Sequence, residues 1–250
     1  MGKRIELKSA SEIEKMRKAG ALLRQVFNEF EKHIAPGITT AELDKKAEKL
    51  IRDAGARPAF LGYNGFPATL CTSINEQVVH GIPNRRALKE GDIVSVDCGL
   101  VLGGFFADTA KTYPVGRISA EAEALLKATE ESLYVGIEEM KVGNRLGDLS
   151  AAIQDHIEAR GFAIVRDYTG HGIGRAMHEA PQVPNYGTRG DGRRMEVGLV
   201  LAIEPMVNVG TWKTRTLDDD WTVVTADGSL SAHFEHTIAV TADGPLILTA

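Results

Sequence analysis

Apolar residues recur at the three- and four-residue spacing of amphipathic helices in two separate parts of the chain. Two helices are predicted between Ser9 and Gly55, and each opens with a Ser or Thr followed three residues later by Glu, the capping-box signature. Two more helices are predicted over 119–141 and 147–160, and Gly161 ends the second of them. We interpret the first pair as scaffold.

The segment 92–112, DIVSVDCGLVLGGFFADTAKT, predicts a β-hairpin, because Gly103 and Gly104 separate two apolar runs that favour strands. Asp97 and Asp108 lie on opposite arms, and each interrupts a run that should be buried. A buried carboxylate needs a proton, a cationic partner or a metal. One buried Asp is most often a structural hydrogen-bonding residue, but two that converge across one hairpin indicate a cation site.

Shorter β-prone runs lie on both sides of this hairpin. A strand over 69–80 is expected to deliver His80 to its end. A strand over 197–203 is expected to stop at Glu204, since the Pro that follows restricts Glu204 to extended conformations. The remaining predictions are a short strand at 162–165, loops at 59–67 and 168–187, and two hairpin signals, Asp227-Gly228 and Asp243-Gly244, with a strand between them that contains His233, Glu235 and His236.

The order of elements is helix pair, strands, helix pair, strands, which indicates an internal duplication with little sequence identity left. Strands and helices are grouped rather than alternating, so the expected class is α+β, with a mainly antiparallel sheet and helices on one face. No linker or low-complexity stretch interrupts residues 1–250, which we expect to form a single domain.

The composition is that of a globular protein with an ample core: 250 residues, 43% hydrophobic and 25% charged. The formal net charge of −5 argues against a general nucleic-acid binder, and no specific DNA contact is expected. Residues 1–58 nevertheless hold thirteen Lys or Arg against nine Asp or Glu. Such a basic rim is usually a solvated face, and a nucleic-acid contact is the alternative.

Cys71 and Cys98 form no CxxC pattern and read as reduced thiols of a cytoplasmic protein. The N-terminal sequence lacks the apolar region of a secretory signal. No window approaches the ~20 apolar residues of a membrane helix. We therefore expect a cytoplasmic protein without membrane contact.

Four carboxylates and one imidazole recur at strand ends and in Gly-rich segments: Asp97, Asp108, His171, Glu204 and Glu235. Taken singly, each residue also has a purely structural interpretation. His171, for example, could be a turn residue, and Glu235 could point to solvent. If they converge, two divalent cations would balance the four carboxylates and leave room for one bridging hydroxide. Oxygen-rich ligands with one nitrogen suit Mn, Fe(II), Co or Zn, and the lack of thiolate argues against a structural zinc site. Charge counting alone does not establish convergence.

Six spaced segments carry a further signal: NEQVVHGIP, DIVSVDCG, ADTAKTYPVG, YTGHGIGRAMHEAPQVPNYG, VLAIEPM and SAHFEHTIAV. In combination they resemble those of the type I methionine aminopeptidases, and the resemblance covers nearly the whole chain. It implies the pita-bread fold, a pseudo-two-fold α+β arrangement. It also implies a metal-dependent hydrolase that removes the initiator methionine from nascent proteins when the second residue is small, using a hydroxide activated by two metal ions.

Carried over position by position, the resemblance assigns the five ligands to two divalent ions. Asp97 would chelate one metal, Asp108 and Glu235 would bridge both, and His171 and Glu204 would complete the other. The metal ions that these five residues are expected to bind are Fe(II), Mn, Co or Zn.

The resemblance also implies three catalytic roles. Glu204 would take the proton of the attacking water and pass it toward the departing nitrogen. His178 would contact the substrate carbonyl and help to stabilise the tetrahedral intermediate. His80 would face the scissile region on the leaving side.

A methionine pocket is implied by the same resemblance, since aromatic rings and soft sulfur suit a thioether. Its predicted lining is Phe60, Tyr63, Phe66, Cys71, His80, Met177, His178 and Trp221. Read without the family, the aromatics would be ordinary core. The sequence departs from some relatives here, with Asn64 where some have His and Met177 where some have Phe.

The implied partners are nascent polypeptide N-termini, with a transient ribosome contact through the core domain. We expect a monomer without the N-terminal extension of some relatives, and Gly2 makes the chain's own terminus a predicted substrate. Two alternatives stay open. An X-Pro aminopeptidase or prolidase usually carries an additional N-terminal domain, and a peptide-binding module that lost catalysis would lack metal ligands.

Overall fold

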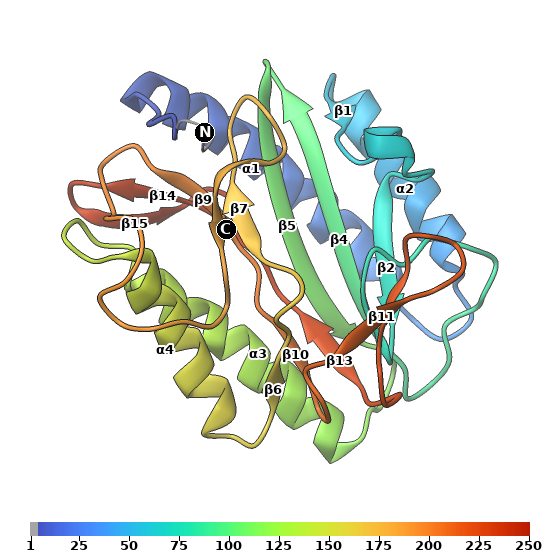
Figure 1. Ribbon diagram of the computed structural model, residues 1–250. Coiled ribbons are helices and arrows are strands. Elements are labelled where there is room, and N and C mark those ends of the chain that lie inside the picture. Colours follow the sequence, from blue (N-terminus) through green and yellow to red (C-terminus); the bar gives the residue numbers. More distant parts are fainter. Residues whose placement is uncertain (1–4) are drawn as a thin grey trace.

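Both predicted helix pairs form in the computed structural model of the protein, which describes residues 5–250 (Figure 1). They are α1 (Ala10–Phe30) with α2 (Thr40–Asp53), and α3 (Ala120–Glu138) with α4 (Leu146–Glu158). Ser9 with Glu12, and Thr39 with Glu42, form the expected capping boxes. Gly2, the predicted substrate position, lies outside the described residues. None of the described helices combines the length and apolar character needed to cross a membrane.

The central hairpin is confirmed as β4 (Ile93–Leu102) and β5 (Phe105–Pro114), paired antiparallel along their whole length. Gly103 and Gly104 have φ of 58° and 83°, so both occupy the left-handed region that a two-residue type I′ turn requires. Gly99 is paired with Asp108. Asp97 is two residues from Gly99, so both aspartates project from the same face of the hairpin.

Two larger sheets frame the molecule, and every strand pairing between residues 5 and 250 is antiparallel. In the first, β4 pairs with β1 (Arg57–Pro58), β2 (Leu70–Ile74) and β5. The second has the order β15 (Gly244–Ile247), β14 (His236–Thr241), β9 (Val200–Ile203), β7 (Gly170–Gly172) and β8 (Glu179–Val183). An isolated bridge between Ala110 and Glu235 joins the two halves.

Two three-stranded sheets complete the fold. One has the order β13 (Ser231–His233), β10 (Met206–Asn208) and β6 (Ala163–Ile164), and the other β11 (Thr214–Thr216), β12 (Val223–Thr225) and β3 (Gln77–Val79). Short 3₁₀ helices occupy Glu31–His33 and Tyr63–Gly65.

Each helix pair covers its own half of the strands with a separate apolar core (Figure 1). The hairpin face opposite Asp97 contributes Val94, Val96, Cys98 and Leu100 to the core under α1 and α2. The core under α3 and α4 contains Leu201, Ile203 and Ile238. This is the predicted α+β arrangement, with the helices on one side of the strands and the polar hairpin face turned to the other.

Two sequence predictions about strands near the site were wrong. The run 69–80 is not one strand, because Asn75 has φ of 56° and separates β2 from β3, which join different sheets. The segment 168–187 is not simply a loop, because β7 and β8 form within it and pair with each other and with β9. Its glycine content hid these strands, of which β7 also depends on a distant partner, β9.

The late hairpin signals had mixed outcomes. Asp243-Gly244 does connect the paired strands β14 and β15. Asp227-Gly228 joins no hairpin, because β12 pairs with β11 and β3 whereas β13 pairs with β10. The predicted strand through His233, Glu235 and His236 is broken at 234–235, where the chain leaves one sheet for the other. This break places Glu235 between the two halves.

Candidate metal centre

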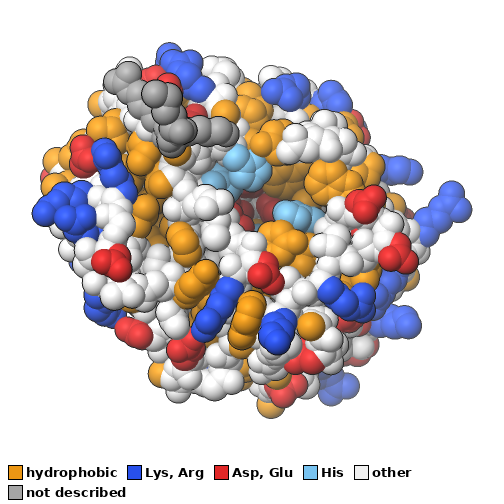
Figure 2. Space-filling model, in the orientation of Figure 1, with side chains coloured by type: hydrophobic (Ala, Val, Ile, Leu, Met, Phe, Trp, Pro, Cys, Tyr) orange, Lys and Arg blue, Asp and Glu red, His pale blue; other side chains and the backbone are white. Residues whose placement is uncertain are grey.

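Every residue predicted for the site lines one cavity of ≈ 190 Å³. The lining is Phe60, Tyr63, Asn64, Phe66, Cys71, His80, Asp97, Asp108, His171, Met177, His178, Glu204, Trp221 and Glu235. Figure 2 shows a hollow in this face of the molecule, with histidine side chains at its mouth and acidic side chains visible within. The structure thus brings together the acidic and the aromatic residues that the sequence separates.

The acidic residues reach the cavity from both halves of the fold. Asp97 on β4 and Asp108 on β5 come from the hairpin. Glu204 follows the last residue of β9, where the next residue is Pro, and Glu235 lies in the break between β13 and β14. The Glu235 backbone N–H donates to the Ala110 carbonyl at 2.9 Å, which ties Glu235 to the strand that carries Asp108.

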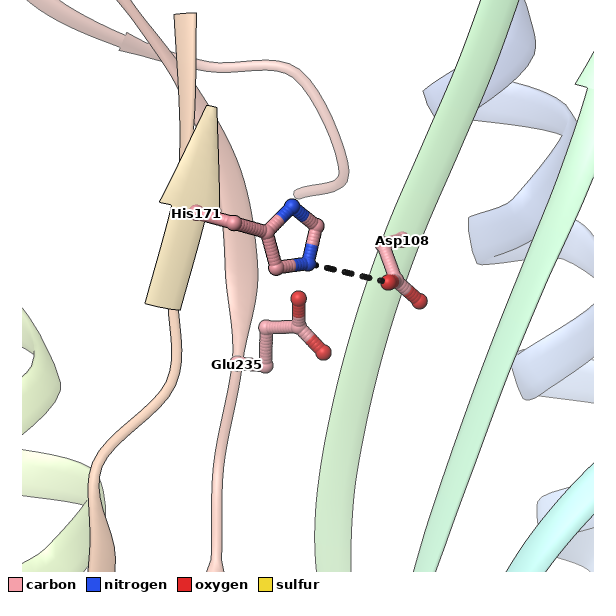
Figure 3. A group of neighbouring side chains, drawn as sticks. All are labelled: Asp108, His171 and Glu235. Atoms are coloured by element: carbon pink, nitrogen blue, oxygen red, sulfur yellow. Dashed lines mark ion pairs between the residues drawn. The ribbon is translucent and has the colours of Figure 1, made fainter. Parts of the chain in front are cut away.

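His171 lies on β7 and faces the carboxylates (Figure 3). Its Nε2 is 3.8 Å from Asp108 Oδ2 and 3.6 Å from Glu204 Oε1. One ligand atom from each of Asp108, His171 and Glu235 lies within 4.8 Å of the others. The ring Nδ1–H donates to the Gly172 carbonyl at 2.9 Å. That bond leaves the Nε2 lone pair of a neutral ring free to bind a cation.

Burial makes the ionised form of these carboxylates unfavourable when no cation is bound. It raises the pKa of Asp108 to about 7, and burial together with the neighbouring carboxylates raises the pKa of Asp97, Glu204 and Glu235 well above their usual values. Among the described residues, Asp97 Oδ1, Asp108 Oδ1 and Glu235 Oε1 have no hydrogen-bond partner. Buried polar atoms are rarely left unpaired, so these three oxygens fit a bound cation.

The donor set also fits the chemistry of a divalent transition metal. It offers carboxylate oxygens and one imidazole nitrogen, which suit Mn, Fe(II), Co or Zn. Burial, followed by the neighbouring His178, lowers the pKa of His171 to about 4, so the ring is neutral and able to act as a ligand. Cys71 lines the cavity as a buried thiol whose pKa is raised by burial, and it offers no thiolate.

Two further histidines line the same cavity as the carboxylates. His178 Nδ1 is 2.8 Å from the Tyr63 hydroxyl, and the two rings stack with centroids 5.4 Å apart. The His178 ring centroid is 4.2 Å from that of His171. His80 follows β3 with φ of 59° and packs edge-on against Tyr168 at 5.6 Å. Burial lowers the pKa of His80 to about 4, so its ring is neutral at pH 7.

The other side of the cavity is apolar. Phe66 packs edge-on against Trp221 with ring centroids 5.1 Å apart, and Phe60, Cys71 and Met177 are buried beside them. These residues form a hydrophobic cluster that is continuous with the carboxylate site, because both line the same cavity.

Three residues that shape the site escaped the sequence reasoning. A Cβ at Gly99 would lie 2.9 Å from Phe60 Cε1 and 3.2 Å from Met177 Cε, so this position must lack a side chain. His233 lies behind Glu204, with Nε2 3.7 Å from Glu204 Oε2. Lys8 reaches Glu179 at 2.5 Å and so braces the loop after β7. The signals were weak: a Gly two residues after a candidate ligand, and a His two residues before another.

Comparisons with known proteins agree with this geometry. The model of metallopeptidase family M24 matches residues 14–242. A methionine aminopeptidase of Clostridium perfringens is 56% identical over 245 residues, which are 98% of this chain and 98% of that protein. The crystal structure of the methionine aminopeptidase of Thermotoga maritima has a TM-score of 0.97 at 47% identity and covers 98% of this chain and 99% of its own. An Xaa-Pro dipeptidase of Bacillus anthracis has a TM-score of 0.78 at 22% identity over 97% of this chain and 61% of that one, which shows the fold alone.

Proposed function

The chain belongs to the methionine aminopeptidases of metallopeptidase family M24, and we propose that it removes the N-terminal methionine from newly made polypeptides whose second residue is small. The observation that carries the proposal is one cavity in which buried, unpaired carboxylate oxygens adjoin an apolar aromatic pocket. Such a cavity can hold a free amine and a scissile carbonyl at one end and an apolar side chain at the other.

The residues that would hold two divalent ions are Asp97, Asp108, His171, Glu204 and Glu235. Asp108 and Glu235 would both supply carboxylate oxygens, since the Ala110 bridge ties Glu235 to the strand that carries Asp108 and one ligand atom of each lies within 4.8 Å of the other. Bound ions of this kind polarise a carbonyl and lower the pKa of a water molecule. Mn, Fe(II), Co and Zn all fit the ligand set.

Glu204 would transfer the proton, and His80 and His178 would stabilise the charge that develops on the substrate. The Glu204 carboxylate would accept a proton from the attacking water and return it to the leaving amide nitrogen. If the Tyr63 hydroxyl donates to His178 Nδ1, a neutral His178 ring carries its proton on Nε2, which would donate to the substrate carbonyl oxygen. The His80 ring, which is neutral at pH 7, would face the leaving side.

The apolar half of the cavity would bind the methionine side chain. A thioether gains ~0.3–1.5 kcal/mol from each contact with an aromatic edge, and Phe60, Phe66 and Trp221 supply such edges. In this proposal the unbranched methionine side chain lies in the apolar pocket, and the small second residue lies beside His80 and His178.

We propose a single catalytic domain over residues 1–250 that works as a monomer in the cytoplasm. Its macromolecular partners would be nascent-chain N-termini, with a transient ribosome contact through residues 1–58, whose sequence has more Lys and Arg than Asp and Glu.

The test is metal-dependent cleavage of Met-Ala-Ser compared with Ala-Pro-Ser. Metal-stripped protein would be reconstituted with Mn, Fe(II), Co or Zn, and Asp97→Ala and Glu204→Ala would be assayed alongside. We expect methionine release from the first peptide, dependent on added metal and lost in both variants. Cleavage of the Pro peptide would instead assign an Xaa-Pro activity, and folded, metal-binding protein without turnover would make the chain a peptide-binding module.

A further inference from the structure

His233 lies at the end of β13, immediately behind Glu204 and outside the lining of the cavity. Its side chain is 1% exposed. Nε2 is 3.7 Å from Glu204 Oε2, and within the described part of the chain it has no hydrogen-bond partner. The other oxygen of the same carboxylate, Oε1, faces His171 at 3.6 Å. Glu204 therefore stands between one imidazole inside the cavity and one behind it.

The backbones on both sides of this contact are fixed. The Thr112 hydroxyl accepts from the His233 backbone N–H at 2.9 Å and donates to the His233 carbonyl at 2.8 Å, which ties His233 to the strand that carries Asp108. Asn185 Nδ2 donates to the Glu204 carbonyl at 3.0 Å. The gap between the side chains exceeds a hydrogen bond of 2.7–3.2 Å by only about half an ångström, so a small rotation of either side chain closes it.

The chemistry of a buried imidazole gives this contact a direction. Burial disfavours the charged ring, so His233 carries one N–H and one lone pair. A carboxylate oxygen accepts only, so a hydrogen bond across this gap has Nε2–H as donor and Glu204 Oε2 as acceptor. Carboxylates that bind metals are commonly held by such outer partners, which fix their orientation.

We propose that His233 is a positioning residue for Glu204: its Nε2–H binds Oε2 and so keeps Oε1 turned into the cavity. The inference rests on the proposed role of Glu204 as ligand and proton acceptor. Without the N–H, the plane of the Glu204 carboxylate can rotate about the last side-chain bond, so its oxygens are no longer held at one angle toward the cavity. Metal binding and proton transfer then both lose a preorganised group.

The test compares two substitutions of similar size. His233→Gln keeps a donor nitrogen near the position of Nε2, and His233→Leu removes it. Each variant would be measured for the midpoint of thermal unfolding without metal, for the dissociation constant and visible absorption spectrum of bound Co(II), and for kcat and KM on Met-Ala-Ser. His156→Leu is the control, because it removes a mostly buried imidazole from α4, a helix that contributes nothing to the cavity.

We expect His233→Leu to bind Co(II) about 10–100-fold more weakly, with an altered spectrum and a lower kcat, while KM changes less than about threefold. His233→Gln should lie within about threefold of the parent in both constants, and His156→Leu should match the parent. Folded His233→Leu with the parent's Co(II) affinity, spectrum and kcat would overturn the proposal.

Two further arms keep the test decisive. If His233→Leu does not fold, His233→Asn replaces it, because its shorter amide cannot reach Glu204. Weaker Co(II) binding in His233→Asn but not in His233→Gln supports positioning, and equal weakening in both variants contradicts it. If the parent protein shows no turnover with any metal, the proposed function fails. The Co(II) affinities and spectra of the variants still decide whether His233 orients Glu204.

Discussion

Gly99 lies where the apolar wall of the cavity meets the central hairpin, and it leaves no room for a side chain. A Cβ there would be 2.9 Å from Phe60 Cε1, 3.1 Å from Ala59 Cβ and 3.2 Å from Met177 Cε. The backbone of Gly99 is ordinary β-strand, so Ala is allowed by its dihedral angles and excluded only by its neighbours. A methyl group would push Phe60 and Met177 into the space proposed for the methionine side chain.

We therefore predict that Gly99→Ala raises KM for Met-Ala-Ser about tenfold or more, because overpacking costs ~1–3 kcal/mol. The reacting groups are not displaced, so kcat should change less than KM. Steady-state kinetics on folded protein give the answer, and Gly99→Ala combined with Met177→Ala is the control, since it returns part of the space. An unchanged KM in Gly99→Ala would mean that Phe60 and Met177 move to accommodate the methyl group without weakening substrate binding.

At the residue level, the sequence predicted the carboxylates better than their supports. Asp97 and Asp108 stood out because a charged residue inside an apolar run violates the strand's own pattern. His233 gave no such signal, since its importance depends on a residue 29 positions earlier that only folding brings to 3.7 Å. The sequence also did not indicate the role of Gly99, because the need for a missing side chain can be recognised only when the neighbouring residues are known.

Among the structural elements, the loop between β7 and β8 contains Met177 and His178. Glu179 at its end closes it, because one carboxylate oxygen accepts the backbone N–H groups of Arg175 and Ala176 at 2.7 and 3.1 Å. The other oxygen binds Lys8, whose own backbone N–H donates to Gly198. The segment before α1 is thus a brace for the loop.

We predict that Glu179→Gln lowers both stability and activity. The Lys8 and Glu179 side chains are 3% and 15% exposed, so the variant leaves a buried ammonium group without its counter-charge, at a cost of about 3 kcal/mol. Loss of the brace should also lower kcat/KM about tenfold or more, since small misplacements of catalytic groups are costly. Hydrogen exchange of the amides at 174–178 should accelerate.

The matched control is the surface pair Arg17–Glu14, whose side chains are 53% and 48% exposed. Arg17→Met should leave the unfolding midpoint, kcat/KM and amide exchange unchanged, because solvent screens such pairs. Equal effects of the two substitutions would show that the brace does no more than an exposed ion pair.

The same loop shows why the element predictions failed where they did. The Gly103-Gly104 hairpin is local, so its turn residues and its flanking strands could be read together. Strand β7 has three residues, two of them glycine, and forms only because β8 and β9 pair with it. Strands defined by distant partners leave little trace in their own sequence.

For the whole molecule, the duplicated halves meet at the carboxylates. Asp97 and Asp108 lie in the first sheet, His171 lies in the second, and Glu204 directly follows a strand of the second. Ions bound between them would act as a cross-link between two separately packed cores. We predict that each bound ion, with Mn or Co(II) at 100 times its dissociation constant, stabilises the fold by about 2.7 kcal/mol, or roughly 5–10 °C in the unfolding midpoint. Differential scanning calorimetry of stripped and reconstituted protein measures this shift, and identical midpoints would argue against an interfacial metal site.

The metal-free protein should also have a characteristic pH dependence, which Asp108→Asn isolates. The folded-state pKa of Asp108 is raised to about 7, above an unfolded value near 4. A raised carboxyl pKa gives stability that is present below the unfolded value and is lost as pH rises through the folded value. The buried His80, His171 and His233 have lowered pKa values and act in the opposite sense, so the parent's own pH curve mixes the two signs.

Subtracting one protein from the other reduces the contribution of the histidines, although His171, which lies 3.8 Å from Asp108, does not cancel fully. We predict that metal-free Asp108→Asn becomes progressively more stable than the parent between pH 4 and 7, and that the advantage levels off above. Relief of repulsion on Asp97 and Glu204 has the same sign. With saturating metal at pH 7.5 the order should reverse, because the ion needs the ionised carboxylate that Asn lacks. Urea unfolding at each pH measures both differences in stability. A difference that does not vary with pH would show that folding does not raise the pKa of Asp108.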